Sequence, residues 1–155
     1  MIRIAQADLT DPEVRDLVAY HQCDMQEISP PGTSFALDLS GLSGADVTLL
    51  GGWKDDRLVT IGALKRLGNG VAELKSMRTL PDYLGRGYGT AMLDALIELA
   101  RSEGVVRLSL ETGTSTDFAA AIALYSRKGF VAGDRFAGYV NGPHNQCYHL
   151  NLEAG

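Results

Sequence analysis

Apolar and polar positions alternate along several short segments of the chain, which is the pattern of a half-buried strand. Two turn sequences, Asp55-Asp56 and Gly68–Gly70, separate three of these segments and predict a meander of hairpins. The expected strands are a short one at Ile2 and Ile4, followed by Val47–Trp53, Leu58–Arg66, Val71–Thr79, Val105–Leu110, Phe130–Ala132 and Gln146–Leu152.

Other segments repeat their apolar residues at the three- and four-residue spacing of a helix. The expected helices run from a Thr10–Glu13 capping box to about Gln22, from Thr90 to Gly104, and from Thr116 as N-cap to Lys128. A short helical piece is expected at Ser34–Leu39, between the helix-breaking Ser29–Thr33 and a loop at Gly41–Gly44. This order of elements predicts one α/β domain over residues 1–155 with a mixed sheet.

A glycine-rich loop stands between the third strand of the meander and the helix that follows it. Gly85, Gly87 and Gly89 alternate just where that helix should begin. Glycine lets backbone N–H groups approach an anion closely, and the positive end of the helix dipole lies behind them. The loop therefore predicts a phosphorylated cofactor.

Two kinds of phosphate-binding loop can be compared with this one. A P-loop would end in Gly-Lys-Ser/Thr, and that ending is missing here. A dinucleotide-binding turn fits better, because Gly87 and Gly89 open the helix and Glu111 ends the next strand. Against it, Met92 occupies the third glycine position, and Pro81–Leu84 separates the strand from the glycines. A dinucleotide-dependent oxidoreductase stays an alternative interpretation.

Composition narrows the class of protein. The 155 residues are 45% apolar and 21% charged, with a net charge of −5; this is typical of a soluble globular domain and argues against nucleic acid as a partner. No apolar run is long enough to span a membrane, and the N-terminus lacks a signal-peptide pattern, so we expect a cytoplasmic protein. Neither the cysteines, Cys23 and Cys147, nor the scattered histidines have metal-ligand spacing, so we expect reduced thiols and no metal.

The segment Glu73–Glu111 resembles motif A of the GNAT superfamily of N-acetyltransferases, whose loop reads Arg/Gln-x-x-Gly-x-Gly/Ala. Both loop glycines match, while Leu84 stands at the position of the Arg or Gln. The segment Ala121–Phe130 resembles the next motif, Ala-x-x-Leu-Tyr-x-x-x-Gly-Phe, and Phe118 stands where an Asn often opens it. Three shorter segments look like a bacterial subgroup of uncharacterised acetyltransferases: Ser29–Pro31, Gly62–Lys65 and Ser109–Gly113.

The resemblance implies a mixed, mostly antiparallel sheet with helices on both faces and a central pair of strands that splays apart. It also implies acetyl-CoA as the donor, with its pyrophosphate on the glycine loop and its pantetheine arm along the free edge of the preceding strand. The cofactor-binding residues that it indicates are Met77, Arg78, Thr79, Leu84, Gly85, Arg86, Gly87, Tyr88, Gly89 and Thr90.

The resemblance further implies direct transfer of acetyl to an amine in a ternary complex, since neither cysteine stands where the thioester should lie. Tyr125 matches the family's usual acid, which protonates the leaving thiolate. Glu73 has the spacing from the glycine loop that is seen for the catalytic glutamate of related histone acetyltransferases, and Glu111 lies across the expected splay. Either carboxylate, or a water chain, is the expected base. His21 and Tyr139 are expected to contact the acceptor.

The expected acceptor is a primary amine of a small molecule or of an amino terminus. The net charge of −5 mildly favours a cationic acceptor. Folds of this kind commonly dimerise, and the sequence leaves a homodimer open. A non-catalytic acyl-CoA sensor is a second alternative, because Leu84 and Phe118 depart from the motifs that they stand in.

Overall fold

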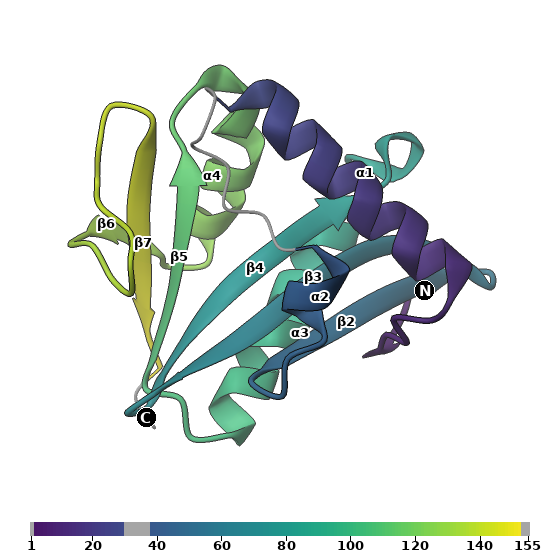
Figure 1. Cartoon of the computed structure of the whole chain (residues 1–155), viewed down its shortest axis with the longest axis horizontal. Coiled ribbons are helices and arrows are strands. Elements are labelled where there is room, and N and C mark those ends of the chain that lie inside the picture. The colour runs from purple at the N-terminus through teal and green to yellow at the C-terminus, as the bar shows by residue number, and fades with distance from the viewer. Residues whose placement is uncertain (1, 30–37, 153–155) are drawn as a thin grey trace.

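The protein forms a seven-stranded sheet with helices on both faces (Figure 1). The strand order is β1-β2-β3-β4-β5-β7-β6. The computed structural model describes residues 2–29 and 38–152. The strands are β1 (Arg3–Gln6), β2 (Val47–Lys54), β3 (Arg57–Gly68), β4 (Val71–Thr79), β5 (Arg107–Gly113), β6 (Val131–Gly133) and β7 (Asn145–Asn151). The helices are α1 (Pro12–Ile28), α2 (Leu39–Leu42), α3 (Tyr88–Ser102) and α4 (Ala119–Arg127), with 3-10 turns at Pro81–Tyr83 and Thr116–Phe118.

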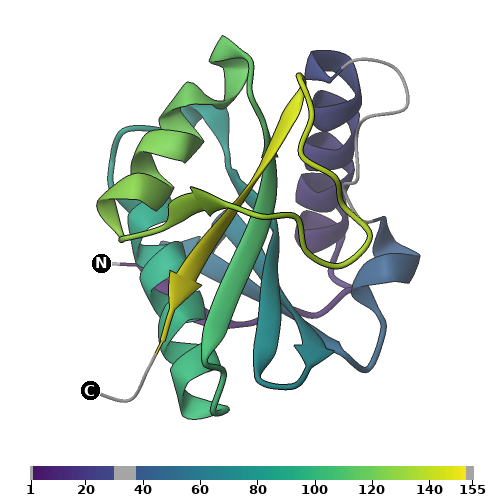
Figure 2. The same cartoon turned by 90° about the vertical axis from the view of Figure 1, so that its left-hand side faces the viewer.

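The two faces of the sheet have separate apolar cores. Figure 2 shows α1 on one side of the sheet and α3 and α4 on the other. Fully buried Met92, Leu93 and Leu96 of α3 belong to one core, and Val14 and Leu17 of α1 belong to the other. Burying each such side chain contributes about 1.5–3 kcal/mol, so this packing fixes both helix layers against the strands.

The central strands β4 and β5 separate soon after they meet. They are parallel and pair only from Val71 opposite Arg107 to Glu73 opposite Ser109. All the other strand pairs of the sheet are antiparallel. Beyond Glu73 the two ribbons diverge, toward the top of Figure 1. The mostly antiparallel sheet with a splayed central pair is thus confirmed.

A bulge bends β4 where the separation begins. The register with β3 shifts between Ile61 and Ala63, and Ser76 on the bulged strand has a left-handed φ of 56°. Gly62 lies opposite, and a Cβ there would stand 2.6 Å from the sulfur of Met77. A bulge increases the local twist and bend of its strand, so it directs β4 away from β5.

The first helix differs from its expected bounds at both ends. Its N-cap is Asp11, which accepts from the Glu13 N–H at 2.9 Å, whereas Thr10 donates its hydroxyl to Asp8 at 2.7 Å. The expected Thr10 cap was wrong: the helix begins one residue later, at the cap Asp11, and the Thr10 hydroxyl points to Asp8. The helix also continues past Gln22 to Ile28, since no glycine or proline interrupts the polar stretch between them.

Two further boundaries also differ from the predictions. The expected loop at Gly41–Gly44 was wrong in part, because α2 covers Leu39–Leu42 and Asp38 caps it by accepting from the Gly41 N–H. Thr116 is not a helix cap: it begins a 3-10 turn, and α4 starts at Ala119 without a side-chain cap. Residues 30–33 of the expected breaker and 34–37 of the expected helical piece lie outside the described residues.

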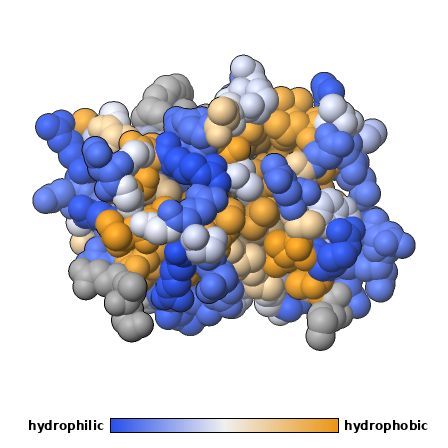
Figure 3. Space-filling model, turned by 90° about the horizontal axis from the view of Figure 1, so that it is seen from below, coloured by the Kyte–Doolittle hydropathy of each residue, from blue (hydrophilic) through white to orange (hydrophobic). Residues whose placement is uncertain are grey.

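Apolar side chains on the surface are dispersed. In Figure 3, which shows the molecule from below, apolar and hydrophilic residues are interspersed. The large apolar residues that are exposed belong to different segments: Tyr20, Leu84, Val106, Val131 and Val140. Single exposed apolar residues are normal in folded proteins. None of the helices in the described ranges is both long and apolar enough to cross a membrane.

Candidate active site

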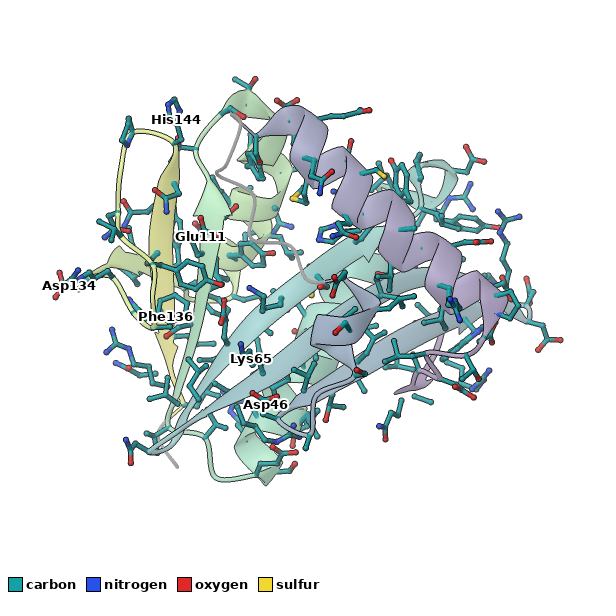
Figure 4. The ribbon with its side chains drawn as sticks, in the orientation of Figure 1. Asp46, Lys65, Glu111, Asp134, Phe136 and His144 are labelled. Carbon is teal, nitrogen blue, oxygen red and sulfur yellow. The ribbon has the colours of Figure 1, made fainter. Side chains whose placement is uncertain are left out.

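A cavity of about 580 Å³ occupies the space where β4 and β5 part. Its walls come from the C-terminal half of α1, from β4, from β5 and the turn after it, from α4 and from the loop before β7. Figure 4 labels Glu111 on β5, with His144 above it and Phe136 below it on the loop that joins β6 to β7. The cavity is therefore bounded by segments that are far apart in the sequence.

The structure brings most of the predicted chemical residues to this one cavity. Glu73, Glu111, Tyr125 and His21 all line it. Tyr139 reaches the same place indirectly, because its hydroxyl bonds to Glu73. The sequence motifs indicated these residues separately, and the parting of two strands places them around one space.

Glu73 is buried and already has strong partners. Its Oε2 lies 3.2 Å from the ammonium of Lys75 and accepts a 2.5 Å hydrogen bond from the Tyr139 hydroxyl. Lys75 also donates to the Tyr139 oxygen at 2.6 Å. The side chains of Glu73 and Lys75 are 4% and 9% exposed, so the carboxylate and the ammonium neutralise one another out of water. Lys75 is a site residue that the sequence analysis missed.

Glu111 has a different environment from Glu73. Burial raises the pKa of its carboxyl above the usual value, and the negative charge of Glu73 acts in the same direction. A hydrogen bond from Asn145 and the charge of Lys75 oppose this rise in pKa. A carboxylate with a raised pKa is a stronger base than a free one, so Glu111 is suited to accept a proton.

Tyr125 is placed on α4 with its ring against Phe130, at a centroid distance of 5.8 Å and edge to face. The side chain is buried, and burial raises the pKa of its phenol to about 12, opposed by the positive charge of Arg78. No described residue forms a hydrogen bond with its hydroxyl. Tyr125 is thus a protonated, unengaged donor at neutral pH.

His21 is bound to β4 through Arg78. The Arg78 Nε–H donates to Nδ1 of His21 at 2.9 Å, and the same guanidinium forms a 2.8 Å ion pair with Asp24. Burial, followed by the charges of Arg78 and Lys75, lowers the pKa of His21 to about 3. His21 is therefore a neutral imidazole across the physiological range. The Arg78 side chain thus links β4 to α1, and no local sequence pattern indicated this contact.

The glycine loop presents an open backbone at the start of α3. Gly85 and Gly87 have left-handed φ angles of 75° and 85°, and a Cβ on either would meet nothing within 4 Å. Gly87 is the N-cap of α3 and no side chain caps this end, so the first N–H groups of the helix lack intrahelical partners. Gly89 is instead inside the first turn of the helix. The loop fits the phosphate site expected from the sequence.

The other predicted cofactor contacts surround this loop. Met77–Thr79 lies beyond the last β4–β5 pair, so in the described parts of the chain its edge toward β5 has no partner strand. Arg86 lies over the ring of Tyr83 at 5.2 Å, and Leu84 is 64% exposed. Leu84 is thus a solvent-facing loop residue.

Phe118 is packed against the end of β5. A Cβ on Gly113 would lie 2.2 Å from its ring, so the phenyl group and the bare glycine backbone fit one another. Phe118 is buried and lines the cavity. Phe118, in place of the Asn that often opens this motif, therefore adds apolar packing beside the cavity.

The described residues contain no group of three or more His, Cys, Asp or Glu side chains arranged to hold a metal ion. His149 bonds Ser109 at 2.7 Å through Nδ1 and the Asp134 carbonyl at 2.7 Å through Nε2. Because Ser109 is fully buried, this pair supports the structure and presents no nucleophile. Cys23 and Cys147 are free thiols.

Comparisons with known proteins identify the family. The profile of the acetyltransferase (GNAT) family matches residues 12–130. An uncharacterised N-acetyltransferase of Escherichia coli, YedL, is 43% identical over 152 residues, which are 98% of this chain and 96% of YedL. A putative acyl-CoA N-acyltransferase structure from Klebsiella pneumoniae is 29% identical, with a TM-score of 0.83 over 99% of both chains.

A more distant structure has the same fold. The PaiA N-acetyltransferase of Thermoplasma acidophilum, solved in complex with coenzyme A, has a TM-score of 0.75 and is 14% identical over 98% of this chain and 99% of that one. The family match favours the acetyltransferase interpretation of the glycine loop over a dinucleotide-binding turn.

The buried pair of Glu73 and Lys75 makes a prediction about stability. Lys75→Met should lower the free energy of unfolding by about 3–5 kcal/mol, because it leaves a buried carboxylate without its cation. Lys128→Met is the matched control, since Lys128 forms a 2.8 Å pair with the half-exposed Asp94 and should change stability by about 1 kcal/mol or less. Urea unfolding measures both, and equal losses would contradict the prediction.

Proposed function

The chain belongs to the acetyltransferase (GNAT) family and is an acyltransferase, and from this premise we propose that it transfers acetyl from acetyl-CoA to the primary amine of a small molecule or of an amino terminus. One observation supports this most strongly. The cavity beside the free edge of β4 holds a protonated phenol, Tyr125, together with a carboxylate of raised pKa, Glu111. Amine acetylation needs a proton donor and a proton acceptor at one place.

Acetyl-CoA fits the backbone features around this cavity. The N–H groups of Gly85–Thr90 would hold the pyrophosphate, because the space beside Gly85 and Gly87 is open and a helix of 15 residues begins there. The free edge of Met77–Thr79 would pair with the amide-rich pantetheine arm as a strand would. When bound, acetyl-CoA supplies a thioester carbonyl for the amine to attack and a thiolate that leaves. The coenzyme A complex of the fold relative from Thermoplasma acidophilum supports this assignment.

The side chains then divide the proton transfers between them. Glu111 takes a proton from the ammonium of the acceptor, since its raised pKa makes it a stronger base than a carboxylate in water. Glu73 is less suited to this role because Lys75 and Tyr139 already engage its carboxylate. Tyr125 keeps its proton at neutral pH and gives it to the leaving thiolate. The acceptor amine attacks directly, as neither cysteine is among the described residues that line the cavity.

The cofactor site is tested at Gly87. Gly87→Val should weaken CoA binding at least tenfold, or about 1.4 kcal/mol, because a side chain would enter the open space in front of the N–H groups. Gly104→Val is the matched control: Gly104 also has a left-handed φ, 78°, and open space, but it follows the far end of α3. Calorimetry should show lost affinity for Gly87→Val alone. Equal affinity in both folded variants would remove this loop as the phosphate site.

The reaction and its acid are tested by release of free thiol from acetyl-CoA with a panel of primary amines. Tyr125→Phe should preserve the fold and CoA affinity, since only a hydroxyl is lost, and should lower kcat by about 10²-fold or more. A wild-type protein that releases no thiol with any amine would overturn the proposed function. If kcat of Tyr125→Phe stayed within about twofold of wild type, the proposed function would stand, but Tyr125 would be a packing residue and not the acid.

The base is tested by the pH profile. The base must be deprotonated, and the pKa of Glu111 is raised by burial. We therefore expect kcat/KM to fall as pH decreases through an apparent pKa above the usual value of about 4.3 for Glu. Glu111→Gln should lower turnover by about 10²-fold or more, and raising the pH should partly restore it as the free amine becomes abundant. Glu73→Gln should keep the acidic limb of the profile. An unchanged profile in Glu111→Gln would indicate a water relay or an acceptor that binds as the neutral amine.

A further inference from the structure

His21 lines the cavity, and one of its two ring nitrogens, Nδ1, has a hydrogen-bond partner in the protein. It lies in the wall that α1 contributes, and its side chain is 6% exposed. Nδ1 faces the Nε–H of Arg78 at 2.9 Å. No other described residue bonds to the ring. Nε2 is not among the side-chain atoms that are shut off from solvent without a partner, so it is accessible and free to bond a ligand or water.

The hydrogen-bond partner fixes which nitrogen carries the proton. A guanidinium only donates, so Nδ1 must present its lone pair to Arg78. The proton of the neutral ring then stands on Nε2, which becomes a donor. Arg78 cannot easily turn away, because Asp24 binds its Nη1 at 2.8 Å and the Tyr20 ring lies 5.5 Å from its Cζ. His21 therefore offers a fixed N–H donor on the cavity wall.

This donor has no role in the proton transfers that were assigned to Tyr125 and Glu111. A neutral imidazole whose lone pair is already engaged cannot accept a proton from an ammonium. Burial and the charges of Arg78 and Lys75, which keep the ring neutral, would also oppose its protonation by the acceptor. The remaining chemical capacity of His21 is to donate one hydrogen bond to an oxygen of whatever occupies the cavity.

The rest of the cavity wall favours a cation. The described lining residues with formal charge are the carboxylates Glu27, Glu73, Glu111 and Asp117 and the ammonium of Lys75. An amine that arrives as an ammonium meets this negative excess, and His21 adds a requirement for an oxygen on the same ligand. A space of about 580 Å³, part of which the acetyl thioester needs, leaves room for one residue-sized group.

We propose that His21 is a specificity residue that selects acceptors bearing an aminoacyl group, in which a carbonyl or carboxylate oxygen lies on the carbon next to the amine. The oxygen accepts from Nε2–H of His21 while the amine lies toward Glu111. This inference deepens the proposed function and rests on it. The group occurs in free α-amino acids and at the amino-terminal residue of peptides.

The kinetic test compares two acceptors that differ in this oxygen, alaninamide and 2-aminopropane. His21→Leu should lower kcat/KM for alaninamide about tenfold, mainly through KM, and should change that for 2-aminopropane by no more than about twofold. Each variant is compared with wild type on the same amine, so differences in amine basicity cancel. Gln26→Leu, on the exposed side of α1, is the matched control and should change neither.

Rescue by a conservative variant separates hydrogen bonding from packing. In His21→Gln the amide oxygen can accept from Arg78 while the amide N–H donates into the cavity. This variant should recover most of the activity with alaninamide that His21→Leu loses. Free alanine and trialanine, tested beside alaninamide, show which source of the aminoacyl group the site prefers.

Two measurements do not depend on turnover. In ¹⁵N spectra the His21 ring should show a protonated Nε2 and an unprotonated Nδ1 from pH 5 to 8. In the presence of CoA, calorimetry should show alaninamide binding to wild type and to His21→Gln, and about tenfold weaker binding to His21→Leu.

The outcomes separate this inference from the proposed function. Equal losses for both amines in His21→Leu, no loss with alaninamide, or a protonated Nδ1 would overturn the role of His21 and leave the acetyltransferase function intact. If the wild-type protein released no thiol with any of the amines, the proposed function itself would be overturned. In that case the calorimetric difference between His21→Leu and His21→Gln still decides whether His21 binds the aminoacyl group.

Discussion

The separation of β4 from β5 is the constraint on which the rest of the site depends. Two parallel strands that stay paired leave no space between them and no free backbone edge. Here the pairing ends at Glu73, a few residues before the bulge at Ser76. The separation opens a cavity and frees the Met77–Thr79 edge. Ala72 and Leu74 anchor β4 in the core beneath α3, and Arg78 binds His21 and Asp24 of α1 on the other face, so the opening is a fixed feature of the fold.

Burial gives similar side chains in this cavity different chemistry. Glu73 and Glu111 are both glutamates on neighbouring strands, yet one is neutralised by Lys75 and the other has a raised pKa. The imidazole of His21 is kept neutral, and the phenol of Tyr125 keeps its proton. These differences follow from which charge lies nearby and how much water is excluded. The arrangement divides the roles of base, acid and hydrogen-bond donor among residues that the chain contributes from separate elements.

Much of the architecture could be predicted from local patterns. The meander, its two turns and the strand at Val71–Thr79 follow from the alternation of apolar residues and from turn chemistry, which act over a few neighbouring positions. The errors lie at boundaries where a competing local bond decided the outcome. Asp8 took the Thr10 hydroxyl, and Asp38 capped a helix where glycines suggested a loop. Such competition between polar side chains cannot be ranked from their order in the sequence.

The sequence by itself determined the elements, the glycine loop and the motif residues such as Tyr125, because each depends on neighbours along the chain. The tertiary structure alone decided their chemistry. Lys75 was not indicated as a site residue, yet it neutralises Glu73 only because β4 buries both, with Tyr139 arriving from the loop before β7. The side chain of Arg78 turns toward His21 and Asp24 because α1 packs against β4. Charge pairing and desolvation act between elements that meet only after folding, so no local pattern could encode them.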